Sequence, residues 1–250
     1  MSKIIENQIF DYIKTNKIVR TKEIEKHFKL TQATARRYLI NLENNQLIIR
    51  TFGENILKEE NNNYEDQFVN QKINENVEIK KLIAQQASKL VSGYKTIFID
   101  SGSLCFFLMD YLEDKELIIF TNSLTNANKA ISLGFKNVYI LGGLLKAKTY
   151  SIVDIDEEAL NKINFPISFI GVNGIDEKFN LFTPEKKEAI TKEKIIFHSL
   201  TTVVLAERTK FDQKSTFNFR PKNKKIIFVT DCDVEANDNN LVVNVKKNRR

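Results

Sequence analysis

Small, hydroxyl, amide and charged residues follow six short apolar runs between residues 96 and 231, and these residues are suited to binding a polar ligand. The apolar runs span residues 96–99, 117–120, 138–141, 167–170, 202–205 and 226–229. The segments that follow them are Asp100-Ser101-Gly102-Ser103, Thr121-Asn122-Ser123, Gly142-Gly143, Gly171-Val172-Asn173-Gly174, Glu207-Arg208-Thr209-Lys210 and Asp231. Segments of this composition bind ligands through backbone N–H groups, hydroxyls and amides.

The chemistry of these segments favours a phosphorylated polyol. Gly102 and Ser103, where a helix is expected to begin, offer backbone N–H groups and a hydroxyl to an anion. Asp100 and Asn122 suit sugar hydroxyls, and Lys210 supplies a cation for a phosphate. The same residue types also fill ordinary turns, so one such segment alone indicates only a turn. Their repetition at six strand ends is what indicates a site.

The elements that position these residues are strands alternating with helices. Short continuous apolar runs separated by helical patterns are typical of strands buried on both faces of an open, mostly parallel sheet. Ligands of such sheets bind outside the carboxyl ends of the strands. Residues 76–250 are therefore predicted to form an α/β domain with a binding site at this edge. Thr183 and Pro184 are predicted to be the N-cap and first residue of the helix that carries Glu188.

Residues 1–57 show a different pattern, of three short helices. Apolar residues recur with helical spacing over residues 3–15, at positions 5, 9, 12 and 13. Thr21 is predicted to cap a second helix, and Thr31 is predicted to cap a third helix that ends near Asn44. Residues 58–75 are polar, Asn-rich and charged, and we expect them to be a linker, either a solvated connector or a loose helix between the domains.

The third helix has one buried face and one polar face. Four residues with i, i+3, i+4 and i+7 spacing are expected to point inward: Ala35, Tyr38, Leu39 and Leu42. Arg37 falls on the opposite face, with Thr34, Arg36 and Asn41 on its flanks. Arginine, threonine and asparagine displayed from the first turns of a helix are typical of a helix that reads the major groove of DNA. For an isolated helix, two solvated arginines would be the simpler interpretation.

Two short apolar runs follow this helix and favour the DNA-binding interpretation. Residues 46–50 and 56–58 flank the segment Thr51-Phe52-Gly53-Glu54-Asn55, and the whole predicts a β-hairpin. Helix, turn, helix and wing then stand in the order of a winged helix-turn-helix.

Charge is concentrated in the same segment. Residues 1–58 contain 11 Lys and Arg and 6 Asp and Glu, which leaves 27 basic and 26 acidic residues in the rest of the chain. A basic segment joined to a nearly neutral one is consistent with a DNA-binding module attached to a second domain. Charge alone is equally consistent with an ordinary solvated surface. The helical pattern is therefore what favours a DNA-binding module.

Other features exclude several classes of protein. No run approaches the ~20 apolar residues of a membrane span, and the first residues soon carry charge, so we expect a cytoplasmic protein without a membrane partner. The two cysteines, Cys105 and Cys232, have no metal-ligand spacing, so no disulfide, metal or cofactor is predicted.

The N-terminal motifs resemble those of the DeoR-type winged helix-turn-helix regulators. That family carries Ser/Thr-x-x-Thr-hydrophobic-Arg-Arg-Asp-Leu, which here reads Thr31-Gln32-Ala33-Thr34-Ala35-Arg36-Arg37-Tyr38-Leu39. Its wing motif Arg-x-x-Gly-Gly appears as Arg50-Thr51-Phe52-Gly53-Glu54. The resemblance and the helical pattern together assign DNA binding to Thr21, Thr31, Gln32, Ala33, Thr34, Arg36, Arg37, Asn41 and Arg50.

The strand-end segments resemble the sensor domain of the same family, in the same order. Its Asp-x-Gly-Thr-Thr, Thr-Asn-Ser, Leu-Gly-Gly, Gly-x-Asn-Gly-Ile, Glu-Ala and Asp-x-Ser-Lys-Phe motifs align with segments that begin at Asp100, Thr121, Leu141, Gly171, Glu188 and Glu207. The chain departs from the family at Leu104, where a hydroxyl is usual, and at Asp154, where glycine is usual. The resemblance implies the fold shared by ribose-5-phosphate isomerases and CoA transferases. It also implies an effector site at Asp100, Gly102, Ser103, Thr121, Asn122, Gly142, Gly143, Asn173, Glu188 and Lys210.

The function implied is that of a homodimeric or homotetrameric regulator that binds double-stranded operator DNA. A phosphorylated sugar would change its affinity for the operator, most commonly by releasing repression of a sugar-catabolism operon. One alternative is a phosphosugar isomerase that uses Asp100, Glu188 or Lys210 for acid and base chemistry. Another is a basic domain that binds RNA or protein.

Overall fold

The computed structural model describes residues 2–16, 18–45, 47–50, 54–57, 69–222, 224–235, 237 and 239–245. The chain forms two compact units, Met1–Asn62 and Asn63–Arg250, and each is described here by itself. The predicted wing turn at residues 51–53 and the predicted linker up to residue 68 lie outside the described residues. Among the described residues, no helix is long and apolar enough to cross a membrane.

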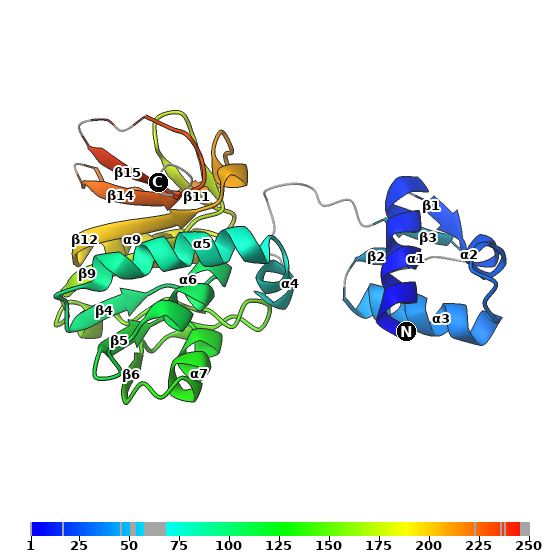
Figure 1. Cartoon of the computed structure of the whole chain (residues 1–250), viewed down its shortest axis with the longest axis horizontal. Coiled ribbons are helices and arrows are strands. Elements are labelled where there is room, and N and C mark those ends of the chain that lie inside the picture. The colour runs from blue at the N-terminus through cyan, green and yellow to red at the C-terminus, as the bar shows by residue number, and fades with distance from the viewer. Residues whose placement is uncertain are drawn as a thin grey trace. The chain divides into compact units, whose positions relative to one another are not determined.

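The first unit contains the three predicted helices and a small antiparallel sheet (Figure 1). Its elements are α1 (Ser2–Asn16), β1 (Ile18–Arg20), α2 (Thr21–His27), α3 (Gln32–Asn44), β2 (Ile48–Arg50) and β3 (Glu54–Leu57). Apolar residues from all three helices meet in one core, which includes Ile9, Ile13, Ile24, Leu39 and Leu42. The described strands pair in the order β1-β3-β2, so β2 and β3 form the predicted hairpin.

One strand of this unit was not predicted, and one predicted helix cap was wrong. Strand β1 was not predicted, because three residues are too few to show a period, and only its pairing with β3 defines it. The N-cap of α2 is Arg20, whose backbone N–H donates to the Glu23 carboxylate at 3.3 Å. Thr21 is instead the first residue of the helix, where its hydroxyl accepts a hydrogen bond from the Asn55 amide at 3.1 Å.

The second unit is built on a parallel sheet with helices on both faces. The elements up to β8 are α4 (Val69–Asn74), α5 (Val77–Ser88), η1 (Lys89–Val91), β4 (Thr96–Ile99), α6 (Ser103–Leu108), η2 (Met109–Tyr111), β5 (Ile118–Thr121), α7 (Leu124–Ser132), β6 (Asn137–Ile140), β7 (Leu144–Leu145) and β8 (Ile152–Val153). The remaining elements are α8 (Glu157–Leu160), β9 (Phe165–Gly171), β10 (Gly174–Ile175), β11 (Leu181–Thr183), α9 (Lys186–Phe197), β12 (Ser199–Ala206), η3 (Arg208–Lys210), β13 (Phe217–Asn218), β14 (Ile226–Thr230) and β15 (Asn240–Asn244).

Seven strands of the described chain form the main sheet, in the order β15-β14-β12-β9-β4-β5-β6, and every pair is parallel. The chain enters this sheet at β4, extends through β5 and β6 to one edge, and then returns to β9 on the other side of β4. The order of the strands therefore reverses between β4 and β9. In open α/β sheets such a reversal leaves a crevice at the carboxyl ends of the two strands.

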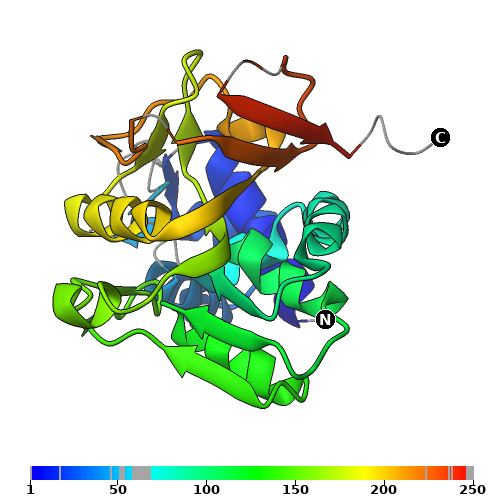
Figure 2. The same cartoon turned by 90° about the vertical axis from the view of Figure 1, so that its left-hand side faces the viewer.

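The sheet separates two hydrophobic cores, because alternate residues of each strand point to opposite faces. Ile97 and Ile99 of β4 pack with α5 and α6, whereas Phe98 packs with α9 in the second core. Figure 2 shows α5 and α9 on opposite sides of the sheet. The predicted mostly parallel α/β domain is thereby confirmed.

The strand and helix predictions for this unit need three corrections. Strand β6 is an edge strand, with Tyr139 53% and Ile140 43% exposed, so it is not buried on both faces as expected. Strand β15 was not predicted, since Asn240 and Asn244 at its ends interrupt the apolar pattern. The N-cap of α9 is Glu185, because Thr183 is still paired within β11.

The expected linker also differs from the observed structure. Residues 69–74 form α4, and Ile73 of this helix packs against the core of the second unit. The segment has few apolar residues, so its pattern did not show that it belongs to the folded domain. The second compact unit accordingly begins before residue 76.

Gly143 allows β7 and β8 to approach closely. A Cβ atom added at Gly143 would lie 2.4 Å from the Val153 carbonyl oxygen, and the glycine has φ +156°. At the adjacent Gly142, no atom of the described residues would lie within 4 Å of an added Cβ. We expect Gly143→Ala to lower the free energy of unfolding by roughly 1–3 kcal/mol, because backbone must shift to accommodate the methyl group. Gly142→Ala is the matched control, and urea unfolding that showed equal losses would contradict this account.

Candidate functional site

Helix α3 presents polar side chains over a buried face, as predicted. Its four predicted inward residues, Ala35, Tyr38, Leu39 and Leu42, are all buried. Arg36 and Arg37 are exposed, and the Arg37 guanidinium lies 5.2 Å from the centre of the Tyr38 ring. Such a contact stabilises a cation by about 0.5–1 kcal/mol at an exposed site. The buried tyrosine thus orients an arginine that remains open to solvent.

The start of α3 is capped as predicted. The Thr31 hydroxyl accepts a hydrogen bond from the Thr34 backbone N–H at 3.3 Å, and the two hydroxyls lie 2.9 Å apart. Gln32 and Ala33 are exposed beside this cap. The first turn of the helix, which the sequence assigned to DNA, is therefore accessible from solvent.

Three other residues that the sequence assigned to DNA are bonded within the unit. The Asn41 amide donates to the Glu6 carboxylate at 3.2 Å, and Arg50 pairs with Glu43 at 3.2 Å. The Thr21 hydroxyl accepts from Asn55, which is fully buried and also donates to the Val19 carbonyl at 3.1 Å. Asn55 was not predicted, and no sequence pattern distinguishes it from an ordinary turn residue. It ties the wing strand β3 to β1 and to the start of α2.

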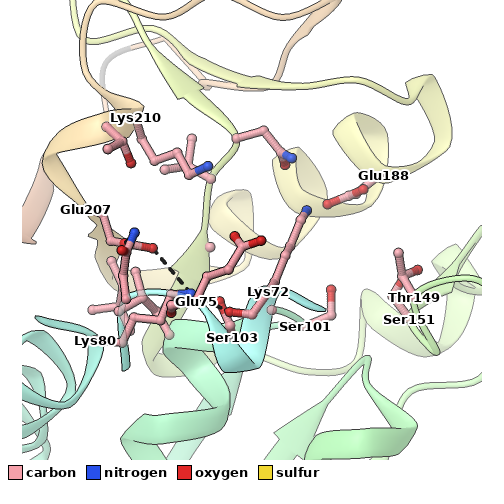
Figure 3. A pocket seen from close by; sticks show the side chains of 18 of the residues that line it. Lys72, Glu75, Lys80, Ser101, Ser103, Thr149, Ser151, Glu188, Glu207 and Lys210 are labelled. Atoms are coloured by element: carbon pink, nitrogen blue, oxygen red, sulfur yellow. Dashed lines mark hydrogen bonds and ion pairs between the residues drawn. The ribbon is translucent and has the colours of Figure 1, made fainter. Parts of the chain in front are cut away.

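The second unit contains a polar pocket at the reversal of strand order (Figure 3). Its volume is about 310 Å³, which suits a small metabolite. The walls come from the segments after β4, β9 and β12, from α9, and from the α4–α5 junction. The lining residues in the described chain are Lys72, Glu75, Asn76, Lys80, Ser101, Gly102, Ser103, Leu104, Thr149, Ser151, Gly171, Val172, Asn173, Glu188, Lys192, Leu205, Glu207, Thr209 and Lys210.

Charged residues are unusually frequent in this lining. Among the described lining residues are four lysines and three glutamates, so their formal sum is +1. Buried charges are costly unless they are paired. The pairing therefore shows how the charges build the pocket.

The buried ion pair between Lys192 and Asp100 forms the floor of the pocket. Asp100 is 1% exposed and Lys192 is 2% exposed. The Lys192 ammonium donates to the Asp100 carboxylate, to the Gly171 carbonyl at 2.9 Å, and lies 3.3 Å from Glu188. Burial alone lowers the pKa of Lys192, but the charges of Asp100 and Glu188 outweigh burial and raise this pKa above its ordinary value. Lys192 therefore remains a cation.

Asp100 also fixes the backbone around the pocket. Its carboxylate accepts from the Gly171 N–H at 3.0 Å, and its carbonyl accepts from the Asn126 amide at 2.8 Å. The Ser101 N–H donates to the Asn122 amide oxygen at 2.9 Å. These bonds hold together the ends of β4, β5 and β9, so Asp100 and Asn122 position the segments that line the pocket.

Glu207 connects the end of β12 to the α4–α5 junction in another wall of the pocket. It lies at the end of β12, accepts from the Asn76 amide at 2.7 Å, and pairs with the Lys80 ammonium at 3.6 Å. Burial lowers the pKa of Lys80, although Glu207 and Glu75 partly oppose this effect. Glu207 thus binds the junction between α4 and α5 to the edge of the sheet.

Lys210 projects into the pocket from η3 (Figure 3). Burial lowers the pKa of Lys210, the positive charges of Lys72 and Lys80 lower it further, and Glu207 and Glu75 oppose them. A cation whose pKa is lowered by burial and by like charges is stabilised when an anion binds beside it. The lysines therefore favour an anionic ligand.

Half of the effector residues predicted from the sequence lie in the described lining of this pocket: Gly102, Ser103, Asn173, Glu188 and Lys210. Asp100, Thr121 and Asn122 are buried and lie behind it. The Thr121 hydroxyl accepts from the Ser123 N–H at 3.1 Å, so it shapes the turn after β5. Gly142 and Gly143 also lie outside the described lining.

The sequence did not single out Lys72, Lys80, Lys192, Thr149 and Ser151 for this site. One signal for Lys192 was available, because it lies four residues after Glu188 and so shares its helical face. Lys80 lies three residues before the buried Ile83 on the inward stripe of α5, where a lysine is unusual. Lys72, Thr149 and Ser151 carried no signal, since only the tertiary fold brings them to the strand ends.

The departures from the family pattern at Leu104 and Asp154, in the second unit, have simple structural explanations. Leu104 is buried in the core that includes α5 and α6, so it adds packing where a hydroxyl was expected. Asp154 has φ +51°, a conformation that favours glycine, and its carboxylate bonds Lys187 at 2.5 Å. Asp154 lies outside the described lining, so its charge does not face the ligand there.

Metal and thiol chemistry receive no support from the described residues. Within the described ranges, no group of three His, Cys, Asp or Glu side chains is placed to hold a metal ion. Cys105 and Cys232 are both buried, and burial raises the pKa of each thiol. Neither thiol is activated as a nucleophile.

A helix-turn-helix unit joined to an α/β unit with a lysine-lined pocket is the architecture of a DNA-binding regulator with a second, sensor-type domain. Residues 75–232 match the family model for the DeoR C terminal sensor domain, and residues 6–60 match the model for the DeoR-like helix-turn-helix domain. The chain therefore belongs to the DeoR family of transcription regulators.

Two curated relatives are named as a transcriptional regulator and a repressor. The chain is 27% identical over 233 residues to the uncharacterized HTH-type transcriptional regulator FruR of Bacillus subtilis, with 92% of each chain covered. It is 26% identical over 216 residues to the glycerol-3-phosphate regulon repressor of Escherichia coli, with 85% of this chain and 84% of the repressor covered. Ribose 5-phosphate isomerase A of Methanocaldococcus jannaschii superimposes with a TM-score of 0.41 and 17% identity, covering 54% of this chain and 55% of the isomerase.

The Asp100–Lys192 pair provides a test of how the pocket is built. We expect Asp100→Asn or Lys192→Gln to lower the free energy of unfolding by about 3–5 kcal/mol, because each leaves a buried charge without its partner. The double variant is expected to lose less than the sum of the two, by roughly 0.5–3 kcal/mol. Lys162→Gln is the control, since its pair with Glu158 is exposed. Additive losses in urea unfolding would show that the two residues act independently.

Proposed function

We propose that this regulator is a repressor of a sugar-catabolism operon and that a phosphorylated sugar in the pocket of the second unit changes its affinity for operator DNA. The observation that carries the proposal is the cluster of four lysines in a pocket whose described lining also presents hydroxyl and amide groups, beside three glutamates and a few apolar side chains. Lysines suit a phosphate, and Ser103, Thr149, Ser151 and Asn173 suit sugar hydroxyls. The name of the Escherichia coli relative, a glycerol-3-phosphate regulon repressor, supports a phosphorylated effector.

Control of DNA binding requires two conformations of the protein. An effector changes operator affinity only to the extent that it binds one conformation more tightly than the other. We propose a homodimer or homotetramer, since helix-turn-helix regulators commonly place two recognition helices on successive turns of DNA. In each copy, Arg36 and Arg37 of α3 would contact the major groove.

A regulatory role also fits the position of Asp100 better than an acid or base role. Its carboxylate is buried, paired with Lys192 and bonded to the Gly171 N–H. A general base must reach the proton that it removes. Turnover of a pentose or hexose phosphate by the purified protein would contradict the regulatory proposal in its present form.

Arg37 tests the DNA contact. On an operator selected from a random duplex library, we expect Arg37→Ala to weaken binding by about 1–3 kcal/mol and to relax the preference at one base pair, as loss of a base contact would. Lys89→Ala removes an equal charge from an exposed position on the second unit and should leave operator binding unchanged. Equal weakening on all sequences would instead assign Arg37 to a phosphate.

The lowered pKa of Lys210 predicts how effector binding depends on pH. A bound phosphate raises the pKa of Lys210, so binding takes up a proton once the free ammonium has begun to titrate. The affinity for a sugar phosphate is therefore expected to fall as pH rises through the alkaline range below the ordinary lysine pKa of 10.5. The second phosphate pKa is about 6, so the ligand itself does not titrate in this range.

The measurement is calorimetric titration with the tightest ligand of a triose, pentose and hexose phosphate panel. Lys210→Gln should bind more weakly at neutral pH and should show a shallower alkaline decline, whereas Lys89→Gln should behave as wild type. Lys72, Lys80, Glu75 and Glu207 also act on Lys210, so a residual slope is expected to remain. If the affinity of Lys210→Gln fell with rising pH as steeply as that of the wild type, Lys210 would not contact the phosphate.

A further inference from the structure

One wall of the pocket comes from α4 rather than from the strand ends. Lys72 of α4 and Glu75, just after it, both line the pocket. Figure 3 shows the Lys72 side chain rising from this helix into the pocket, while Lys210 enters from η3. Two cations from elements far apart in the sequence thus enter one cavity.

The backbone of α4 is anchored, so the position of Lys72 is defined. The Lys80 ammonium donates to the backbone carbonyls of Lys72 and, at 2.7 Å, of Glu75. Lys80 also pairs with Glu207, and Ile73 packs against the core. These contacts hold the C-terminal end of α4 against the sheet edge, while the Lys72 side chain is half-buried at the pocket wall.

The side chains of this wall act on Lys210 electrostatically. The positive charge of Lys72 lowers the pKa of Lys210, and the negative charge of Glu75 raises it. Opposite charges on one short segment therefore influence the same ammonium across the cavity. An anion placed beside Lys210 would feel both charges, with attraction to Lys72 and repulsion from Glu75.

We propose that Lys72 and Lys210 together bind the phosphate group of the effector, and that Glu75 limits the affinity by repelling it. This inference rests on the proposed function of the pocket. It adds α4 to the effector site, which sequence motifs had confined to strand ends, η3 and α9. Along the chain, α4 is the first described element after the helix-turn-helix unit. A phosphate held by Lys72 therefore restrains the segment through which the DNA-binding unit is attached.

Variants of the full-length protein that remove either the positive charge of Lys72 or the negative charge of Glu75 test the proposal. Calorimetric titration would use inorganic phosphate and the panel of triose, pentose and hexose phosphates. Lys72→Gln is expected to weaken binding about tenfold or more, as loss of one charged hydrogen bond does. Glu75→Gln is expected to tighten binding several-fold. Lys81→Gln is the control, because Lys81 lies on α5 in an exposed pair with Glu78, and it should bind as wild type.

The outcomes separate this inference from the proposed function. If Lys210→Gln weakens binding while Lys72→Gln and Glu75→Gln leave it unchanged, α4 is not part of the site, although the pocket still binds phosphate. If the wild type binds none of these phosphates, both proposals are wrong. Hydrogen–deuterium exchange gives a second readout, since a bound phosphate should slow exchange of the amides of residues 69–74 in the wild type but not in Lys72→Gln. Thermal unfolding of each variant shows whether it is folded.

Discussion

The geometry of the pocket in the second unit depends on the buried ion pair between Asp100 and Lys192. It joins the end of β4 to α9, and the Gly171 backbone brings the end of β9 to the same point. Two buried charges are expensive to desolvate, and further hydrogen bonds to each group offset that cost. Strand order reverses between β4 and β9, and an open α/β sheet leaves a crevice outside the carboxyl ends of two such strands. The ion pair sets its floor, and Glu188, one helical turn before Lys192, is thereby placed at its wall.

The remaining charges of the pocket follow from this arrangement. Glu207 pairs with Lys80 and accepts a hydrogen bond from Asn76, which fixes the α4–α5 junction. Lys210 and Lys72 then face the cavity from η3 and α4. Burial and repulsion by the like charges of Lys72 and Lys80 lower the pKa of Lys210. An anionic ligand would relieve that repulsion.

In the DNA-binding unit, buried groups likewise support exposed charged side chains. Buried Tyr38 supports the exposed guanidinium of Arg37, and the Thr31 cap fixes the start of the helix that carries it. Asn55 joins the wing to the first strand and to α2, so the three-stranded sheet and the helices form one rigid support. In both units, buried groups hold the charged side chains that are proposed to contact a ligand.

The sequence by itself determined the two domains, the helix periods of the first unit, six strands of the second and the polar character of their ends. These features depend on local spacing and composition, which neighbouring residues are sufficient to show. The tertiary structure alone decided which polar residues line the pocket and which brace it. Asp100 and Asn122 lie behind the wall, whereas Lys72 reaches it from a segment expected to be a linker, because these roles depend on contacts between residues 20 to 140 positions apart. Strands β1 and β15 were likewise defined only by pairing with distant partners.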